Sequence, residues 1–118
     1  MKKLKVLDYE VKTENINQND YISLTDIAKY KDLRTDYLIS NWLHNKTTIE
    51  FLGLWEKLYN PIFNPMEFHG IKSRSILSVA QWVNITSAIG IVSKSGRYGG
   101  TYAHKDIAFE FAMWICRI

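Results

Sequence analysis

Residues 96–112 are GRYGGTYAHKDIAFEFA, and this stretch decides the architecture that the rest of the sequence predicts. It begins with a glycine-rich tip, because Gly96, Gly99 and Gly100 tolerate the positive φ angles of a tight turn. Strand-like residues flank the tip at 89–94 and from Thr101, so we expect a hairpin that projects from the body. The helix expected over 105–115 should pack centrally in the core, since its apolar face comprises Ile107, Ala108, Phe111, Ala112 and Ile115, widened by Phe109 and Met113.

The sequence before this hairpin predicts further strands and several short helices, and therefore an α+β fold class. The expected elements are a strand at 3–12, a polar turn at 14–20, a returning strand at 21–24, helices at 25–31, 34–45 and 47–59, a loop at 61–68, a strand with a turn at 69–77 and a helix from 78. Two capping boxes mark helix starts, Thr47 with Glu50 and Ser78 with Gln81. We expect Trp42 and Trp55 to be buried on the apolar faces of their helices.

The length and composition fit one compact domain over residues 1–118. Apolar residues make up 47% of the chain and charged residues 23%, which argues against disorder. No apolar run is long enough to span a membrane, and the basic start lacks the apolar segment of a signal peptide. With a single cysteine, the chain cannot form an internal disulfide.

The positive charge is concentrated in one window. The net charge is +3, yet residues 68–105 contain five basic and no acidic side chains, namely Lys72, Arg74, Lys94, Arg97 and Lys105. Such a window favours a surface for a polyanion such as nucleic acid. The alternative is that acidic residues from elsewhere in the sequence neutralise these cations in the folded protein.

No catalytic or metal-binding pattern stands out, so we predict a protein that is not an enzyme and has neither cofactor nor metal. The three histidines, His44, His69 and His104, lack the spacing of a metal site. Cys116 is expected to be a small buried side chain of the last helix. The glycine-rich tip matches neither a P-loop nor a dinucleotide-binding fingerprint.

Residues 96–112 resemble the signature of the KilA-N domain. Two earlier stretches, YISLTDI at 21–27 and SNWLHNKTTIEFLG at 40–53, agree with the same family in the same order. KilA-N domains occur in bacterial, phage and large DNA-virus proteins and resemble the fungal APSES DNA-binding domain, which has a winged-helix-like α+β fold. The resemblance therefore implies a cytoplasmic, regulatory DNA-binding domain that contacts double-stranded DNA through a basic wing and a helix.

The resemblance assigns the hairpin around residues 96–102 as the wing and the helix from Arg34 as the candidate recognition element. Backbone donors where the next helix starts, at Asn45, Lys46 and Thr48, could receive a phosphate, and the alternative for Asn45 is a plain loop residue. Together with the basic window, the candidate DNA-binding residues are Arg34, Thr35, Asn41, Asn45, Lys46, Lys72, Arg74, Lys94, Arg97, Tyr98 and Lys105.

Three expectations stay open. The segment 72–78 is shorter than in the family, so the sequence does not decide whether it forms a hairpin. Since no helix stop signal follows Trp114, we expect the chain to be an N-terminal fragment whose C-terminal partner domain is missing. The alternative function is a protein-interaction module whose basic hairpin binds an acidic partner.

Overall fold

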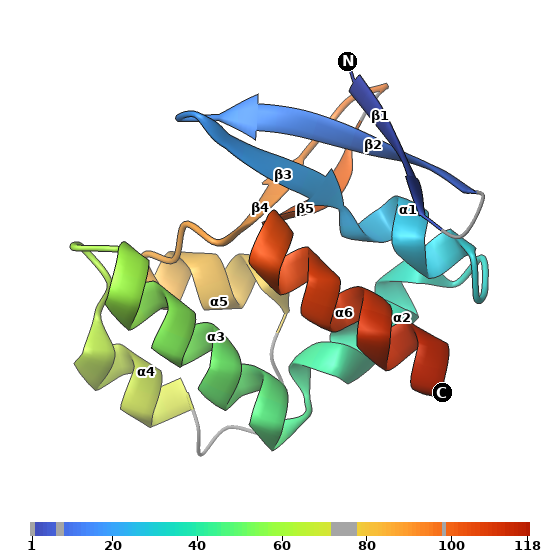
Figure 1. Ribbon diagram of the computed structural model, residues 1–118. Coiled ribbons are helices and arrows are strands. Elements are labelled where there is room, and N and C mark those ends of the chain that lie inside the picture. Colours follow the sequence, from blue (N-terminus) through green and yellow to red (C-terminus); the bar gives the residue numbers. More distant parts are fainter. Residues whose placement is uncertain (1, 7–8, 72–77, 98) are drawn as a thin grey trace.

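The computed structural model describes residues 2–6, 9–71, 78–97 and 99–118, which contain five strands and six helices (Figure 1). In chain order these are β1 Lys2–Val6, β2 Tyr9–Ile16, β3 Asn19–Ser23, α1 Leu24–Lys29, α2 Thr35–Leu43, α3 Lys46–Tyr59, α4 Pro65–Ile71, α5 Val79–Thr86, β4 Ile91–Lys94, β5 Gly100–His104 and α6 Lys105–Arg117. The α+β class is confirmed, and the arrangement is compatible with a small winged-helix-like domain.

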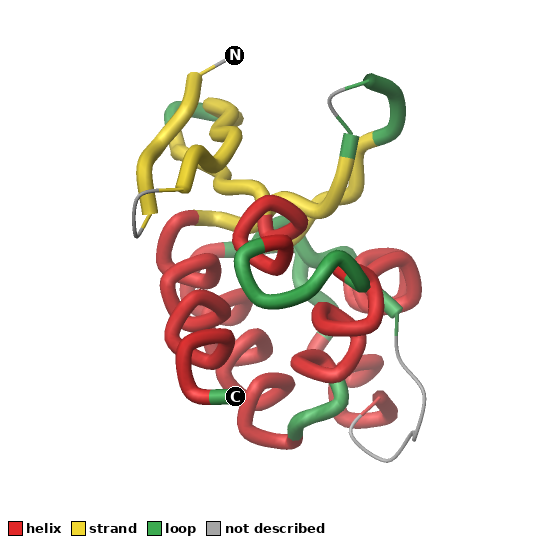
Figure 2. The backbone as a smooth tube through the Cα atoms, turned by 90° about the vertical axis from the view of Figure 1, so that its right-hand side faces the viewer, coloured by secondary structure: helices red, strands yellow, loops and turns green. Residues whose placement is uncertain are grey.

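The strands form one antiparallel sheet in the order β1-β2-β3-β5-β4. Figure 2 shows the sheet above the helices, with β1 to β3 rising on one side and the β4–β5 hairpin on the other. Strand β5 joins the two parts, because Tyr21 of β3 pairs with His104 while Ile91 of β4 pairs with Ala103. The predicted projecting hairpin is therefore confirmed, and it is joined to the sheet through β5, with β4 as the edge strand.

The N-terminal hairpin is more extensive than the sequence predicted. The polar stretch at 14–20 is mostly strand, and only Asn17 and Gln18 form the turn, with φ angles of 51° and 69°. Asparagine tolerates this left-handed region better than most residues, which favours a turn at this point. The strand predicted at 3–12 is also divided, since residues 2–6 pair back onto 9–13.

The core lies between the sheet and the helices, and α6 supplies its centre as predicted. Ile107, Phe111 and Ile115 are buried, whereas Phe109 and Met113 on the same helix are 65% and 43% exposed. Phe109 and Met113 therefore do not extend the buried face as predicted, because only the inner stripe of α6 meets α1, β3 and β5. Trp42 and Trp55 are both buried, as expected.

Two other local predictions were wrong. Residues 65–71, predicted as loop followed by strand, form helix α4, whose first turn is capped by Asn64 through the backbone N–H of Glu67. Helix α3 begins at Lys46 instead of Thr47, so the predicted capping box at Thr47 does not form. The capping box at Ser78 is confirmed, with both reciprocal hydrogen bonds present. Residues 72–77 lie outside the described part of the chain, and with them the open question of a hairpin there.

A buried carboxylate ties α3 to the segment that leads into the hairpin. Glu56 is fully buried and accepts hydrogen bonds from the backbone N–H groups of Ile89 and Gly90, at 3.0 and 2.7 Å, and from the Asn60 amide. Burial raises the pKa of this carboxyl group, and the three donors oppose that rise. The residues just before β4 are therefore held by the helix layer.

In the described ranges, no helix has the length and apolar character needed to cross a membrane.

Candidate nucleic-acid interface

A groove of about 340 Å³ runs between α2, the start of α5 and the β4–β5 hairpin. In the sequence, helices α3, α4 and α5 lie between α2 and the two strands, so only the fold brings α2 and the hairpin together. The apolar floor consists of Ile39, Leu43 and Val79, and the more polar walls consist of Asp36, Ser40, Ser78, Ala80, Ser93 and Thr101. Short hydroxyl side chains from three elements thus face one channel, and such groups can donate to phosphate oxygens or base edges.

A paired arginine stands at the N-terminus of α2. Arg34 is the N-cap residue of α2, and its guanidinium donates to both carboxylate oxygens of Asp32 and lies 5.0 Å from the ring centre of Tyr37. The hydrogen bonds from Arg34 lower the pKa of Asp32 to about 2, so the pair stays charged. The Arg34 side chain remains 70% exposed and can therefore reach a ligand, but its charge is already balanced.

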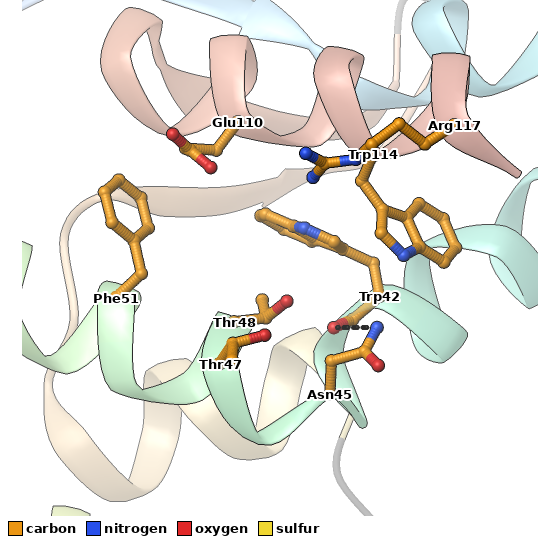
Figure 3. Close-up of a pocket in the computed structure, with 8 residues that line it drawn as sticks. All are labelled: Trp42, Asn45, Thr47, Thr48, Phe51, Glu110, Trp114 and Arg117. Carbon is orange, nitrogen blue, oxygen red and sulfur yellow. Dashed lines mark hydrogen bonds between the residues drawn. The ribbon is translucent and has the colours of Figure 1, made fainter.

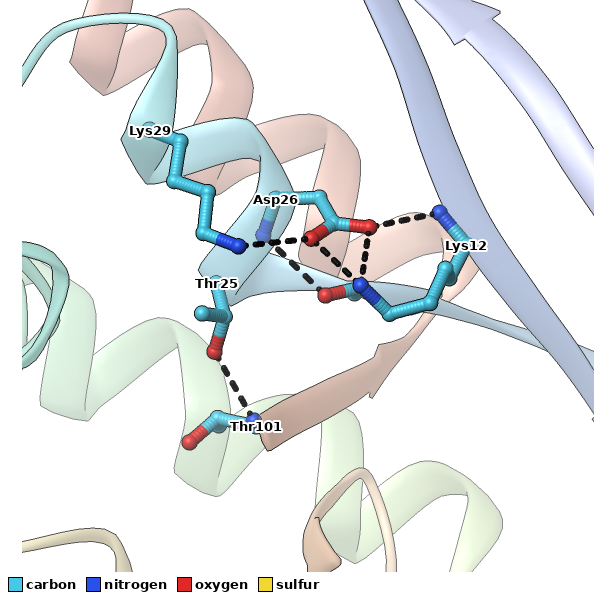
Figure 4. Close-up of polar contacts among 6 residues, drawn as sticks. Lys12, Thr25, Asp26, Lys29 and Thr101 are labelled. Atoms are coloured by element: carbon cyan, nitrogen blue, oxygen red, sulfur yellow. Dashed lines mark hydrogen bonds and ion pairs between the residues drawn. The ribbon is translucent and has the colours of Figure 1, made fainter. Parts of the chain in front are cut away.

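The hairpin is locked to α1 next to its tip by a close backbone approach. The backbone N–H of Thr101 donates to the Thr25 hydroxyl at 3.0 Å (Figure 4). Gly100 has a φ of 139°, and a Cβ on it would lie 2.9 Å from the Thr25 oxygen. Only glycine fits this conformation and this space, so Gly100 fixes where the hairpin leaves the helices.

The sheet side of the hairpin carries balanced charges instead of free cations. Lys94 of β4 forms a salt bridge with Glu14 of β2. Next to it, the Asp26 carboxylate accepts from the backbone and the ammonium of Lys12, and Lys29 lies 3.8 Å away (Figure 4). Of the basic window, Lys94 is thus neutralised by an acid from β2, as the alternative interpretation of the charge pattern predicts, whereas Asp26 of α1 pairs with lysines outside that window.

The predicted DNA-binding residues are distributed over several surfaces. Arg34, Thr35 and Asn41 belong to α2 or its cap, and Lys94 and the exposed Arg97 belong to the hairpin, so these five lie on the elements that bound the groove but do not line it. Asn45 and Lys46 lie where α3 starts, and Lys105 lies at the far end of β5 from the hairpin tip. Lys72, Arg74 and Tyr98 fall outside the described residues.

Sequence reasoning missed the part that α5 plays in the groove. Ser78 and Ala80 line it, and the exposed Asn84 lies one helical turn beyond Ala80 on the same face. The capping box at Ser78 could have predicted this role, because it defines where α5 begins. Once the start of α5 is known, helical spacing places Asn84 on the same face as Ala80. Ser93 and Thr101 gave no comparable signal, since only the pairing of β4 with β5 places them opposite each other.

The described residues contain no group of three side chains that could hold a metal ion. Cys116 is exposed, so the expectation of a buried cysteine was wrong. His104 is buried at the N-terminus of α6, where its Nδ1 accepts from the backbone N–H of Asp106 at 3.2 Å. A histidine that serves as a helix cap in this way needs no catalytic explanation.

Comparison with known proteins gives one match. The family model described as KilA-N domain matches residues 7–117, nearly the whole chain. No curated protein and no solved structure matches the chain.

Proposed function

This chain belongs to the KilA-N domain family, and we propose that it binds double-stranded DNA along the groove between α2, the start of α5 and the β4–β5 hairpin. KilA-N domains are in general DNA-binding domains. The observation that carries the proposal is the groove itself, which is bounded by two helices and a projecting hairpin and lined with hydroxyl groups.

Different parts of this surface serve different contacts. Arg97 at the exposed tip follows the phosphate backbone, because a long cation on a hairpin can reach along it. Lys72, Arg74 and Tyr98, outside the described part of the chain, extend the same contact, and Lys94 joins it when its salt bridge with Glu14 is released. Asn84 offers an amide group that suits base edges. Asn41 has the same group but lies on the face of α2 away from the groove-lining Ser40 and Leu43, so we propose its contact outside the groove.

The remaining candidates are proposed for contacts outside the groove. Lys105 lies beyond the other end of β5, and Asn45 and Lys46 lie at the start of α3. A bent or longer duplex would be needed to reach them as well as the groove.

The finer biological assignment also belongs to this proposal. The arrangement of a hairpin beside helices supports a winged-helix-like, APSES-related mode of binding. We place the chain in a regulatory protein derived from a phage, a virus or a bacterium, acting in the cytoplasm of a bacterial or infected host cell.

Titration of the chain with duplexes selected from a random library, at two salt concentrations, tests the proposal. Arg97→Ala should weaken binding about equally for preferred and scrambled duplexes, because a phosphate contact carries no sequence information. Asn84→Ala should cost about 1–3 kcal/mol on the preferred duplex and little on the scrambled one. Lys57→Ala is the matched control, since Lys57 is an exposed cation on α3 and does not line the groove.

If both groove variants bind like the unsubstituted protein while their folds stay intact, the groove is not the DNA surface. If the unsubstituted chain binds no duplex even at low salt, DNA binding itself is contradicted. In that case the basic hairpin is better explained by an acidic protein partner.

A further inference from the structure

A second, smaller pocket of about 160 Å³ lies between the start of α3, the end of α2 and the C-terminal half of α6 (Figure 3). Its lining residues are Trp42, Asn45, Thr47, Thr48, Phe51, Glu110, Trp114 and Arg117. Figure 1 shows the start of α3 at the end of the molecule away from the sheet, so this pocket is separate from the groove beside the hairpin.

Two nearly buried side chains in this pocket have hydrogen-bond donors without acceptors. Trp42 is 3% exposed and Thr48 is 8% exposed, and both line the pocket. Neither the indole N–H of Trp42 nor the hydroxyl of Thr48 makes a hydrogen bond within the described ranges; in Figure 3 the bond drawn at Trp42 is to its backbone carbonyl. Among the described residues the fully buried side-chain atoms without a partner are in Glu14, Trp55 and Trp82, so the Trp42 and Thr48 donors keep accessible surface. Both are therefore open to an acceptor that enters the pocket they line.

The start of α3 adds further unused donors. The first backbone N–H groups of a helix have no acceptor within it. Asn45, at the N-cap, does not bond to the first turn; its amide donates backward to the carbonyls of Asn41 and Trp42. The first turn of α3 also has no acidic residue, so the positive end of the helix dipole is not compensated from within the helix.

Arg117 brings a positive charge to the same place. Its side chain reaches from α6 toward the pocket (Figure 3), and it makes no salt bridge in the part of the chain that the structure describes. The pocket therefore combines a guanidinium, a hydroxyl, an indole N–H and a helix N-terminus, all of which are donors to an oxyanion.

We propose that this pocket binds a phosphate group, held by the start of α3, Trp42, Thr48 and Arg117. Glu110 on the opposite wall is the one acidic side chain of the lining. Its carboxylate can accept from the remaining hydroxyl of a hydrogen phosphate, or from a donor elsewhere on a phosphate ester. Phe51 and Trp114 supply an apolar wall for the rest of such an ester.

Titration of the ¹⁵N-labelled chain with inorganic phosphate, against chloride at equal ionic strength, tests the pocket directly. We expect saturable shifts of the backbone amides of Thr47 and Thr48 and of the Trp42 indole N–H. Thr48→Val keeps the size and burial of the side chain but removes its hydroxyl, and should weaken binding several-fold, about tenfold for a bond worth about 1.4 kcal/mol. Arg117→Gln should weaken it at least as much, because its bond to phosphate is charge-assisted.

Lys57→Gln is the matched control, because it removes one positive charge at the opposite end of α3 and should leave phosphate binding unchanged. Arg117 is exposed, so Arg117→Gln keeps the test valid even if Thr48→Val fails to fold. Shifts that do not saturate, or equal loss of binding in Lys57→Gln and Arg117→Gln, would overturn the proposal.

Two further titrations identify the source of the phosphate without affecting the test of the groove. A short duplex that shifts Thr48, and does so more weakly in Thr48→Val, indicates the DNA backbone. A deoxynucleoside 5′-monophosphate that shifts Thr48 when the duplex does not indicates a free phosphate ester. Failure of DNA binding at the groove would leave the inorganic phosphate result unchanged, so the two proposals fail separately.

Discussion

Single residues set the limits of what the core can tolerate, and Trp55 illustrates this. Its side chain is 7% exposed and its ring contacts those of Tyr59 and His104, with centres 5.1 and 5.0 Å apart. We expect Trp55→Ala to lower the free energy of unfolding by about 3–5 kcal/mol, because it leaves a cavity in the core. Denaturant unfolding measures this. Leu58→Ala, at a 66% exposed position on the same helix, should change stability by about 0.5 kcal/mol or less. Similar losses in the two variants would contradict the assignment.

His104 makes the stability depend on pH. Burial lowers its pKa in the folded protein, although Asp106 opposes this, and its Nδ1 must stay unprotonated to cap α6. The unfolded chain therefore binds a proton more readily than the folded protein. The stabilisation is complete above a pH of about 6.5 and is lost as the pH falls below that value, by at most about 1.4 kcal/mol per pH unit.

The comparison of the unsubstituted protein with His104→Asn isolates this dependence, because asparagine can cap the helix but does not titrate. Their difference in unfolding free energy, measured between pH 7.5 and 5.5, should shrink as the pH falls. The raised pKa of Glu56 gives the opposite trend, with stability falling as pH rises above its unfolded value, but it acts in both proteins and cancels in the difference. A difference that is constant with pH would show that His104 does not titrate in this range.

At the scale of elements, the two capping-box sequences give opposite outcomes. Ser78 accepts from the backbone N–H of Gln81 at 3.1 Å, whereas α3 begins before Thr47 and that threonine caps nothing. Ser78→Ala should therefore cost about 1 kcal/mol of stability and Thr47→Ala only a few tenths. Thermal unfolding of both variants, side by side, provides the check. Equal costs would mean that α3 starts at Thr47 in solution.

Helices and the hairpin were predicted correctly where a local sequence pattern marked them and was recognised. The apolar stripe of α6, the box at Ser78 and the glycine-rich tip are local patterns, and each correctly predicted an element. Helix α4 also had a local signal, Asn64 followed by Pro65, which suits an N-cap and the first position of a helix. That signal was missed because the two prolines of the segment were interpreted as a loop.

The candidate site could be predicted only in part, for a physical reason. Charge along the chain located the basic window, but not the partners that neutralise it, because Glu14 and Lys94 meet only when β2 and β4 join one sheet. The groove and the phosphate pocket likewise depend on helices distant in sequence. The unpaired donors of Trp42 and Thr48 follow from tertiary packing, and no spacing in the sequence contains that information.

At the scale of the whole molecule, the balance of charge on the sheet should govern DNA affinity. Glu14 now holds Lys94, so Glu14→Gln frees a cation on the proposed DNA surface. We expect this variant to bind duplex DNA more tightly at low salt. If the released lysine contacts one more phosphate, the slope of log affinity against log salt should become steeper by about 0.9. Titrations at a series of salt concentrations measure both effects.

Glu67→Gln distinguishes this local effect from a general one. It raises the net charge of the chain by the same amount, but Glu67 is an exposed residue of α4, which lies in the helix layer away from the hairpin (Figure 1). A general increase in charge would strengthen DNA binding of the two variants equally, since long-range attraction depends on net charge. Release of Lys94 instead makes the slope of log affinity against log salt steeper in Glu14→Gln alone. Equal slopes in all three proteins would place the DNA-binding surface away from the hairpin, because Lys94 can add a phosphate contact only if the backbone passes beside it.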